Sequence, residues 1–493
     1  MAMPGAFRRP IRPSLLPLRV AFMALAICAL LLVNKVGTAG SIIFFGVLAV
    51  MIIRSPEAAF AAFMVAALGM MSNASLVPKT SIWTIGRLAI LFVCFLRFSF
   101  DLAVARKSLF EKPAYWALLL FVAAAATCSM ISGYYVHIAL LKLVSFSVGL
   151  SAVLAGAYVL HLRRADMTPW FVALAGTIVI NGFLALLLGV GYGRSIMGNL
   201  NAGSVFFQGP FYHPNACGPF CGLVIVLLFS IWLFSIHRAR WVCLALIPPL
   251  LYFVWLSKSR TGVASVVAGF LIVGILALMP AAKRFVRLRL NMSRTGLVIA
   301  GAMIAVFAVL VDVGNQGLLS RSFIALINKY DKQAETLESE SILSSRRHLI
   351  EQGWAGFLER PLTGLGFEVS LDPYFVKNAT LFSAPIEKGF LPTAVLEEVG
   401  LFGTVPFVLF LVAMMVALWR QRNAPGLAML ITYLIANLGE VSIFAFGGPG
   451  LLGWLLVAAG MLVGDGCVIT VPPSRQPPRK QPEHSRAEAM HFS

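Results

Sequence analysis

Charged residues are scarce in this sequence. Of its 493 residues, 12% are charged and 59% are hydrophobic. An ordinary soluble domain is roughly 25% charged and less than half apolar, so this chain lacks the polar surface that a water-soluble fold needs. Apolar runs of membrane-spanning length recur along it instead. The composition therefore excludes a soluble globular domain and predicts an integral membrane protein that crosses its bilayer many times.

Cysteines and acidic residues are also few. The seven cysteines are an odd number and lie mostly in apolar runs, which argues against a disulfide framework. Cys217 and Cys221 lack a histidine or cysteine pair at ligand spacing, so packing is favoured over a metal site, and neither metal nor cofactor is expected. The 20 acidic residues leave a net charge of +19. Because the basic excess lies in short loops and the C-terminal tail, membrane lipid is the expected partner and nucleic acid is not.

The basic residues alternate with the apolar runs in a way that predicts topology. With fourteen spans, starting in the cytoplasm, every cluster of arginine and lysine falls on the cytoplasmic side, as the positive-inside rule requires. The weaker runs at 40–72 and 425–440 could be re-entrant, and about twelve spans would then remain. The expected spans are 20–36, 40–53, 57–72, 82–98, 114–133, 138–160, 169–190, 216–236, 241–257, 261–280, 295–313, 389–419, 425–440 and 449–466.

The expected fold class is all-α, a polytopic bundle of about 12–14 transmembrane helices with one large extracytoplasmic loop. A cytoplasmic N-terminal segment (1–19) precedes the main bundle (20–313), and the loop (314–388) leads to C-terminal transmembrane helices (389–466). A disordered cytoplasmic tail (467–493) follows, since it is rich in Pro, Arg, Gln and Glu. The loop has the length to form a structure outside the bilayer, so chemistry is sought there first.

Two short polar motifs lie where spans are expected to meet the outer membrane face. His213-Pro-Asn215 precedes a span. The motif either brings a histidine and an amide to the outer end of that span or simply begins a helix, with Asn215 as the N-cap. Lys258 and Arg260 lie at the junction of two apolar spans. Their side chains could extend to the lipid headgroups or bind a polar ligand, and both alternatives remain.

A third motif lies in the large loop. Arg346 and Arg347 belong to an amphipathic run that should form a helix ending near Pro361, with Gly364 and Gly366 in the turn that follows. An ordinary surface helix would account for this pattern. Arginine also binds phosphate through paired hydrogen bonds and keeps its charge. Taken together, the three motifs favour a lipid-linked anionic substrate.

Over roughly residues 200–465 the sequence resembles the superfamily of bacterial O-antigen ligases and O-antigen or exopolysaccharide polymerases. The resemblance rests on the order and spacing of several motifs, each weak alone. They are His213-Pro214-Asn215 with Gly218, Ser259-Arg260, Arg346 followed by Pro361-x-x-Gly364-x-Gly366, and Glu398-x-Gly400-x-x-Gly403.

This resemblance implies a GT-C-like, metal-independent, inverting glycosyltransferase of the bacterial inner membrane, with its active site facing the periplasm. Such enzymes transfer a glycan from undecaprenyl diphosphate to an acceptor hydroxyl, on a growing glycan or on lipid A-core, and a chain-length regulator is a further candidate partner. In this interpretation Arg260 and Arg346 are catalytic, because cations stabilise the leaving diphosphate. The substrate-binding candidates are Lys258, Arg347, His213, Asn215, Lys388 and Glu398.

The sequence departs from the ligases at the end of the large loop. Ligases carry a His-Asn pair there, whereas this chain has Gly389 and Phe390. The missing histidine favours a polymerase over a ligase. The acceptor still needs a general base, and Glu387 is the best placed because it lies in the loop. The other candidate bases are Glu398, His213 and His348.

Two carboxylates in apolar surroundings have open roles. Glu398 could instead pair with an arginine inside the bundle, and Glu440 could pair with Arg260 or reach the outer interface. Two functions from other classes also remain as alternatives. One is a transporter or flippase of lipid-linked glycans, although no internal repeat is apparent, and the other is a non-enzymatic assembly or sensing protein.

Overall fold

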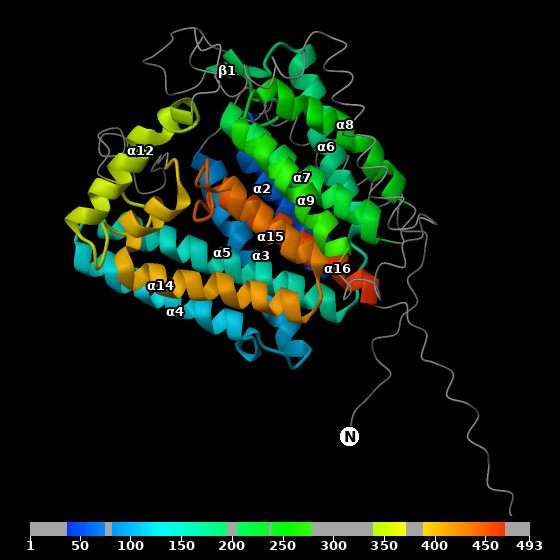
Figure 1. Cartoon of the computed structure of the whole chain (residues 1–493). Coiled ribbons are helices and arrows are strands. Elements are labelled where there is room, and N and C mark those ends of the chain that lie inside the picture. Colours follow the sequence, from blue (N-terminus) through cyan, green and yellow to red (C-terminus); the bar gives the residue numbers. More distant parts are fainter. Residues whose placement is uncertain are drawn as a thin grey trace, which may run out of the picture.

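The computed structural model describes residues 37–73, 81–194, 205–235, 239–278, 339–370 and 388–468. Within these ranges the chain is almost entirely helical (Figure 1). The elements are the helix Gly37–Arg54, α2 (Pro56–Met71), α3 (Ser81–Val104), the 3-10 helix η2 (Leu109–Glu111), α4 (Pro113–Ser132), α5 (Val136–Leu162), α6 (Thr168–Leu187), β1 (Tyr192–Arg194), β2 (Val205–Phe207), α7 (Pro214–Phe234), α8 (Arg240–Ser257), α9 (Arg260–Leu278), α12 (Ser339–Glu359), α14 (Leu391–Arg420), α15 (Ala424–Ala436) and α16 (Pro449–Val468).

The expectation of an all-α, multi-pass membrane protein is confirmed. Among the described residues, seven helices are long and apolar enough to cross a membrane, namely Gly37–Arg54, α4, α5, α6, α7, α8 and α14. Each expected span from 40–53 to 261–280 and from 389–419 to 449–466 overlaps a helix within its described residues, although α15 ends at Ala436, four residues before the end of the span expected at 425–440. The expected spans 20–36 and 295–313 and the N-terminal segment 1–19 lie outside the described residues, as does the tail after residue 468.

Proline marks where many of these helices begin. A proline occupies the first or second position of α2, α4, α6, α7, α14 and α15. Its fixed φ suits the first helical turn, where the missing N–H would have no intrahelical partner. The only sheet in the described part of the chain is a short antiparallel ribbon, with Tyr192 opposite Phe207, just before α7.

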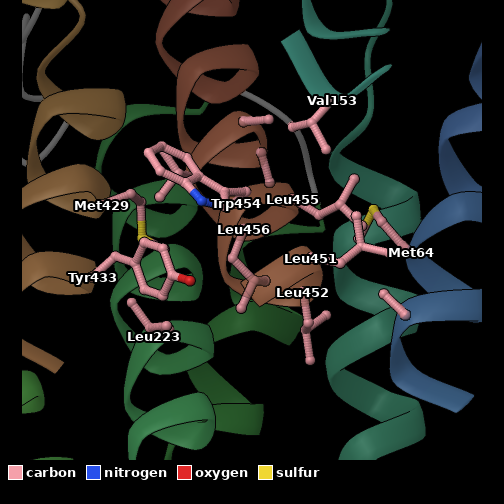
Figure 2. Packing of buried hydrophobic residues seen from close by; sticks show 14 of the residues in the cluster. Met64, Val153, Leu223, Met429, Tyr433, Leu451, Leu452, Trp454, Leu455 and Leu456 are labelled. Atoms are coloured by element: carbon pink, nitrogen blue, oxygen red, sulfur yellow. The ribbon is translucent and has the colours of Figure 1, made fainter. Parts of the chain in front are cut away.

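The centre of the bundle is formed by α7 and α16, which are buried nearly all round. Helices α4 and α14 pack side by side, as do α3 and α5, α7 and α8, and α9 and α15 (Figure 1). Side chains of α16 fill the space between its neighbours, as Figure 2 shows for Leu451, Leu452, Trp454, Leu455 and Leu456, with Met64 of α2, Val153 of α5, Leu223 of α7, and Met429 and Tyr433 of α15.

Candidate functional site

The His-Pro-Asn motif forms the start of α7. His213 is the N-cap, and its Nδ1 accepts a hydrogen bond from the backbone N–H of Asn215 at 3.2 Å. The assignment of Asn215 as the N-cap was therefore wrong by two residues. Pro214 explains the shift, because it takes the first helical position and leaves the residue before it to cap the helix.

The glycine of this motif packs against the Ser-Arg motif. A Cβ on Gly218 would overlap the side chain of Ser259, and a Cβ on Gly262 would lie 2.6 Å from the carbonyl carbon of Gly218. Helices α7 and α9 therefore approach at backbone distance, which small residues make possible in membrane bundles. The Oγ of Ser259 accepts the N–H of Gly262 at 3.1 Å and caps α9.

The turn between α8 and α9 carries the two expected cations. Lys258 ends α8 in the left-handed region at φ 50 and is exposed. Arg260 is the first residue of α9 and is half-buried. The next residue, Thr261, is so close to Gly439 that a Cβ on that glycine would overlap its hydroxyl. The turn that contains Glu440 therefore lies against the turn that contains Arg260.

Helix α12 ends as the sequence predicts. It stops at Glu359, and Pro361 begins a turn in which Gly364 and Gly366 have positive φ, 67 and 119. The backbone of Arg346, Arg347 and His348 lies in α12. Their side chains, and all of Glu387, lie outside the described residues.

The two glycine-rich motifs of the C-terminal half bind each other through their backbones. Gly400 interrupts α14 with φ 56 and ψ −163. The carbonyl groups of Glu397 and Glu398 accept hydrogen bonds from the N–H groups of Leu365 and Gly366, at 2.8 and 2.9 Å. Buried backbone groups need such partners in a membrane, and here the loop replaces the missing turn of α14.

The same docking continues on the other side of the break. The N–H groups of Leu401 and Phe402 donate to the carbonyl oxygens of Pro361 and Leu362, at 2.9 and 3.1 Å. A Cβ on Gly400 would overlap the backbone of Leu362. Only a glycine fits both this conformation and this close approach.

Lys388 lies buried between two adjacent carboxylates. Its Nζ is 3.0 Å from Glu397 Oε2 and 3.0 Å from Glu398 Oε1, and it donates to the carbonyl oxygen of Val369 at 3.1 Å. Burial alone would lower the pKa of Lys388, but the two glutamates outweigh it and raise the pKa above the ordinary value. Lys388 is therefore charged, and the partner of Glu398 is this lysine.

This cluster extends into the loop and to α5. Glu398 Oε2 accepts the N–H of Glu368 at 2.9 Å, and Ser370 donates to Glu397 Oε1 at 3.2 Å. Lys142 of α5 lies 3.4 Å from Glu368 Oε2 and also donates to its carbonyl oxygen at 3.1 Å. Glu368 itself is in the left-handed region at φ 51.

Lys142, Glu368 and Glu397 were not among the residues singled out from the sequence. A signal for Lys142 was present, because a lone lysine inside the long apolar run of α5 calls for a buried partner. The adjacent glutamates at the start of an apolar run are a similar signal.

The turn after α15 joins the two halves of the candidate site. Val441 donates its N–H to the carbonyl oxygen of Lys388 at 3.1 Å, and Leu391 donates to that of Asn437 at 3.2 Å. Through Gly439 the same turn contacts Thr261. The structure therefore connects Lys388 and Glu398 with the Arg260 turn, and through Gly218 with the His213 motif.

The described residues contain no group of three or more His, Cys, Asp or Glu side chains that could hold a metal ion. No family model and no curated protein matches this chain. The resemblance to the ligase and polymerase superfamily therefore rests on the sequence motifs alone and stays a prediction.

Proposed function

We propose that the protein is a membrane glycosyltransferase that polymerises undecaprenyl-diphosphate-linked oligosaccharide repeats at the periplasmic face of the bacterial inner membrane. The observation that carries this proposal is the pairing of the motifs. Those that define the resemblance come from distant parts of the chain, yet Gly218 packs on Ser259 and the loop around Gly364 docks on the break at Gly400.

Two arginines are the proposed ligands of the diphosphate. Arg260 begins α9 beside the turn at Gly439. Arg346 precedes Gly353 by seven residues of α12, roughly 10 Å along the helix axis, and a Cβ on Gly353 would be in contact with Thr393 at 3.4 Å. Fixed guanidinium groups stabilise the negative charge that develops on the leaving diphosphate, because they need not reorganise during the reaction.

The acceptor hydroxyl needs a base, and we assign this role to Glu387. It directly precedes Lys388, whose side chain and carbonyl group are both held by hydrogen bonds. Glu398 is less suited, because it is 2% exposed and already accepts from Lys388 and from the backbone of Glu368. His213 uses its Nδ1 to cap α7.

Reconstitution with defined substrates tests the proposal. The purified protein is placed in vesicles with undecaprenyl-diphosphate-linked repeat units alone, and then with lipid A-core added, and the glycan products are sized. A polymerase gives longer lipid-linked chains without lipid A-core. Products formed only with lipid A-core would identify a ligase. Folded protein that forms no glycosidic bond in either mixture, or that only moves the substrate across the bilayer, would contradict the proposal.

A further inference from the structure

Helix α12 carries an exposed apolar stripe. Trp354, Leu358 and Leu362 are 47%, 59% and 54% exposed. Trp354 and Leu358 are one helical turn apart and share a face of α12, and Leu362 follows in the turn just after the helix. Large apolar side chains gathered on one exposed face indicate a surface that contacts a membrane or another protein.

The opposite face of α12 is packed against the bundle. A Cβ on Gly356 would lie 2.9 Å from Glu397 Cγ, and Gly353 lies next to Thr393. Both contacts are with the first two turns of α14. Arg360, just after the helix, donates to the carbonyl oxygen of Ser132 at the end of α4, at 2.6 Å.

These contacts place α12 across one end of the bundle. In Figure 1 it is inclined to α4 and α14 and rises from near their ends instead of running alongside them. Because α4 and α14 are both candidate membrane spans, a helix inclined to them at their ends lies toward one membrane surface.

The apolar stripe continues onto the outer surface of α14. The carbonyl group of Leu362 accepts the N–H of Phe402 at 3.1 Å. Phe402 is 61% exposed, and Val405, one turn further along the span, is 58% exposed. Exposed apolar side chains on a membrane span face lipid. The stripe of α12 therefore adjoins an exposed apolar surface of a candidate membrane span.

We infer that α12 is an interfacial helix whose Trp354, Leu358 and Leu362 insert into the bilayer at the boundary between headgroups and acyl chains. The sequence of the helix suits this position, because a tryptophan leads the stripe. Tryptophan favours the interface because its ring is apolar and its N–H is polar.

This placement goes beyond the proposed activity and does not depend on it. It also has a consequence for that activity. A helix in this plane holds the backbone of Arg346 and Arg347 at the depth of lipid phosphates, so a lipid-linked diphosphate would reach them from within the membrane.

Spin labels measure the depth of α12 directly. Trp354→Cys and Leu358→Cys are each introduced in a background with Cys28 and Cys467 replaced by serine, since the other five cysteines are buried. Both positions are about half exposed, so labelling leaves the packed face of α12 intact. The labelled proteins are reconstituted in vesicles of phosphatidylethanolamine and phosphatidylglycerol, and collisions with oxygen and with a water-soluble nickel chelate are recorded.

Two matched positions calibrate the measurement. Phe402→Cys reports the exposed apolar surface of α14, and Glu111→Cys reports the exposed 3-10 helix η2, where the side chain is 45% accessible. Labels at 354 and 358 should collide with oxygen several times more often than the label at 111, and with the nickel chelate several times less often. Values equal to those at 111 would overturn the inference. Low collision rates with both reagents would overturn it too, because protein and not lipid would then cover the stripe.

A second measurement avoids cysteine variants altogether. Lipids brominated near the headgroup should quench tryptophan emission more strongly in the wild type than in Trp354→Phe. Equal quenching in the two proteins would contradict the insertion of Trp354.

Discussion

Replacing Lys388 with methionine should destabilise the fold strongly. The substitution keeps the length of the side chain but removes the only charge that lies within 4 Å of both Glu397 and Glu398 among the described residues. These carboxylates are 4% and 2% exposed, so water cannot take the place of the lysine. Breaking a buried ion pair from one side costs about 3–5 kcal/mol, which corresponds to roughly two to four orders of magnitude in the unfolding equilibrium.

Two other lysines provide graded controls. Lys142 lies 3.4 Å from Glu368, with side chains 18% and 16% exposed, and Lys142→Met should have an intermediate effect. Lys107 lies 3.8 Å from Glu111 at an exposed position, with 47% and 45% accessibility. Lys107→Met should cost less than about 1 kcal/mol, because surface pairs are screened by water.

The assay is equilibrium unfolding in mixed micelles with increasing fractions of a denaturing detergent, followed by tryptophan fluorescence. A combined variant, Lys388→Met with Glu397→Gln and Glu398→Gln, removes all three charges and should recover a large part of the lost stability, since neutral replacement of a buried ionic group is often tolerated. The reasoning is refuted if Lys388→Met unfolds like Lys107→Met, or if the combined variant is less stable than Lys388→Met.

The pH dependence of stability gives a separate check. The folded-state pKa of Lys388 is raised above its ordinary value of 10.5, because of the two carboxylates. Its contribution is therefore complete below that value and is lost as the pH rises through the folded-state pKa. The wild type should lose stability in strongly alkaline solution, and Lys388→Met should lack that component. Identical alkaline profiles for both proteins would contradict a charged Lys388.

Four further outcomes are expected. Gly400→Ala should destabilise the protein by more than about 1–3 kcal/mol, because the φ of Gly400 is 56 and a Cβ there would overlap the docked loop. Gly176→Ala is the control, because a Cβ on Gly176 would have no atom within 4 Å and should cost little stability. Equal unfolding midpoints for the two variants would refute the role of Gly400. Arg346→Lys should lose nearly as much transferase activity as Arg346→Ala, because a lysine cannot bind phosphate through a planar fork, and a fully active lysine variant would exclude that role. Activity in the reconstituted assay should survive EDTA, and loss that added divalent ions reverse would contradict a metal-independent mechanism. A reporter fused at residue 340 should be periplasmic and one at residue 290 cytoplasmic, and the opposite pattern would overturn the proposed topology.

The helices were predictable because their signals are local. The length of each apolar run was sufficient to position α4, α5, α7 and α14 to within a few residues, and a proline marks the start of α4, α7 and α14. The end of α12 was likewise predictable, since Pro361 and Gly364 interrupt the chain there. The motifs around His213, Arg260 and Gly364 were chosen by residue type and spacing alone, and their functional roles stay predictions.

The contacts between these motifs were decided by the tertiary structure. Sequence spacing reports which residues share a helix face, but not which distant segment supplies a hydrogen-bond partner. The break at Gly400 removes two hydrogen bonds from α14, and only the folded chain shows that the loop after Pro361 replaces them. In the same way, the sequence marks Lys388 and Glu398 as ionisable groups in apolar surroundings. Their pairing depends on the burial of both side chains and on the 3.0 Å distance between Lys388 Nζ and Glu398 Oε1. Tertiary packing determines the burial and the distance.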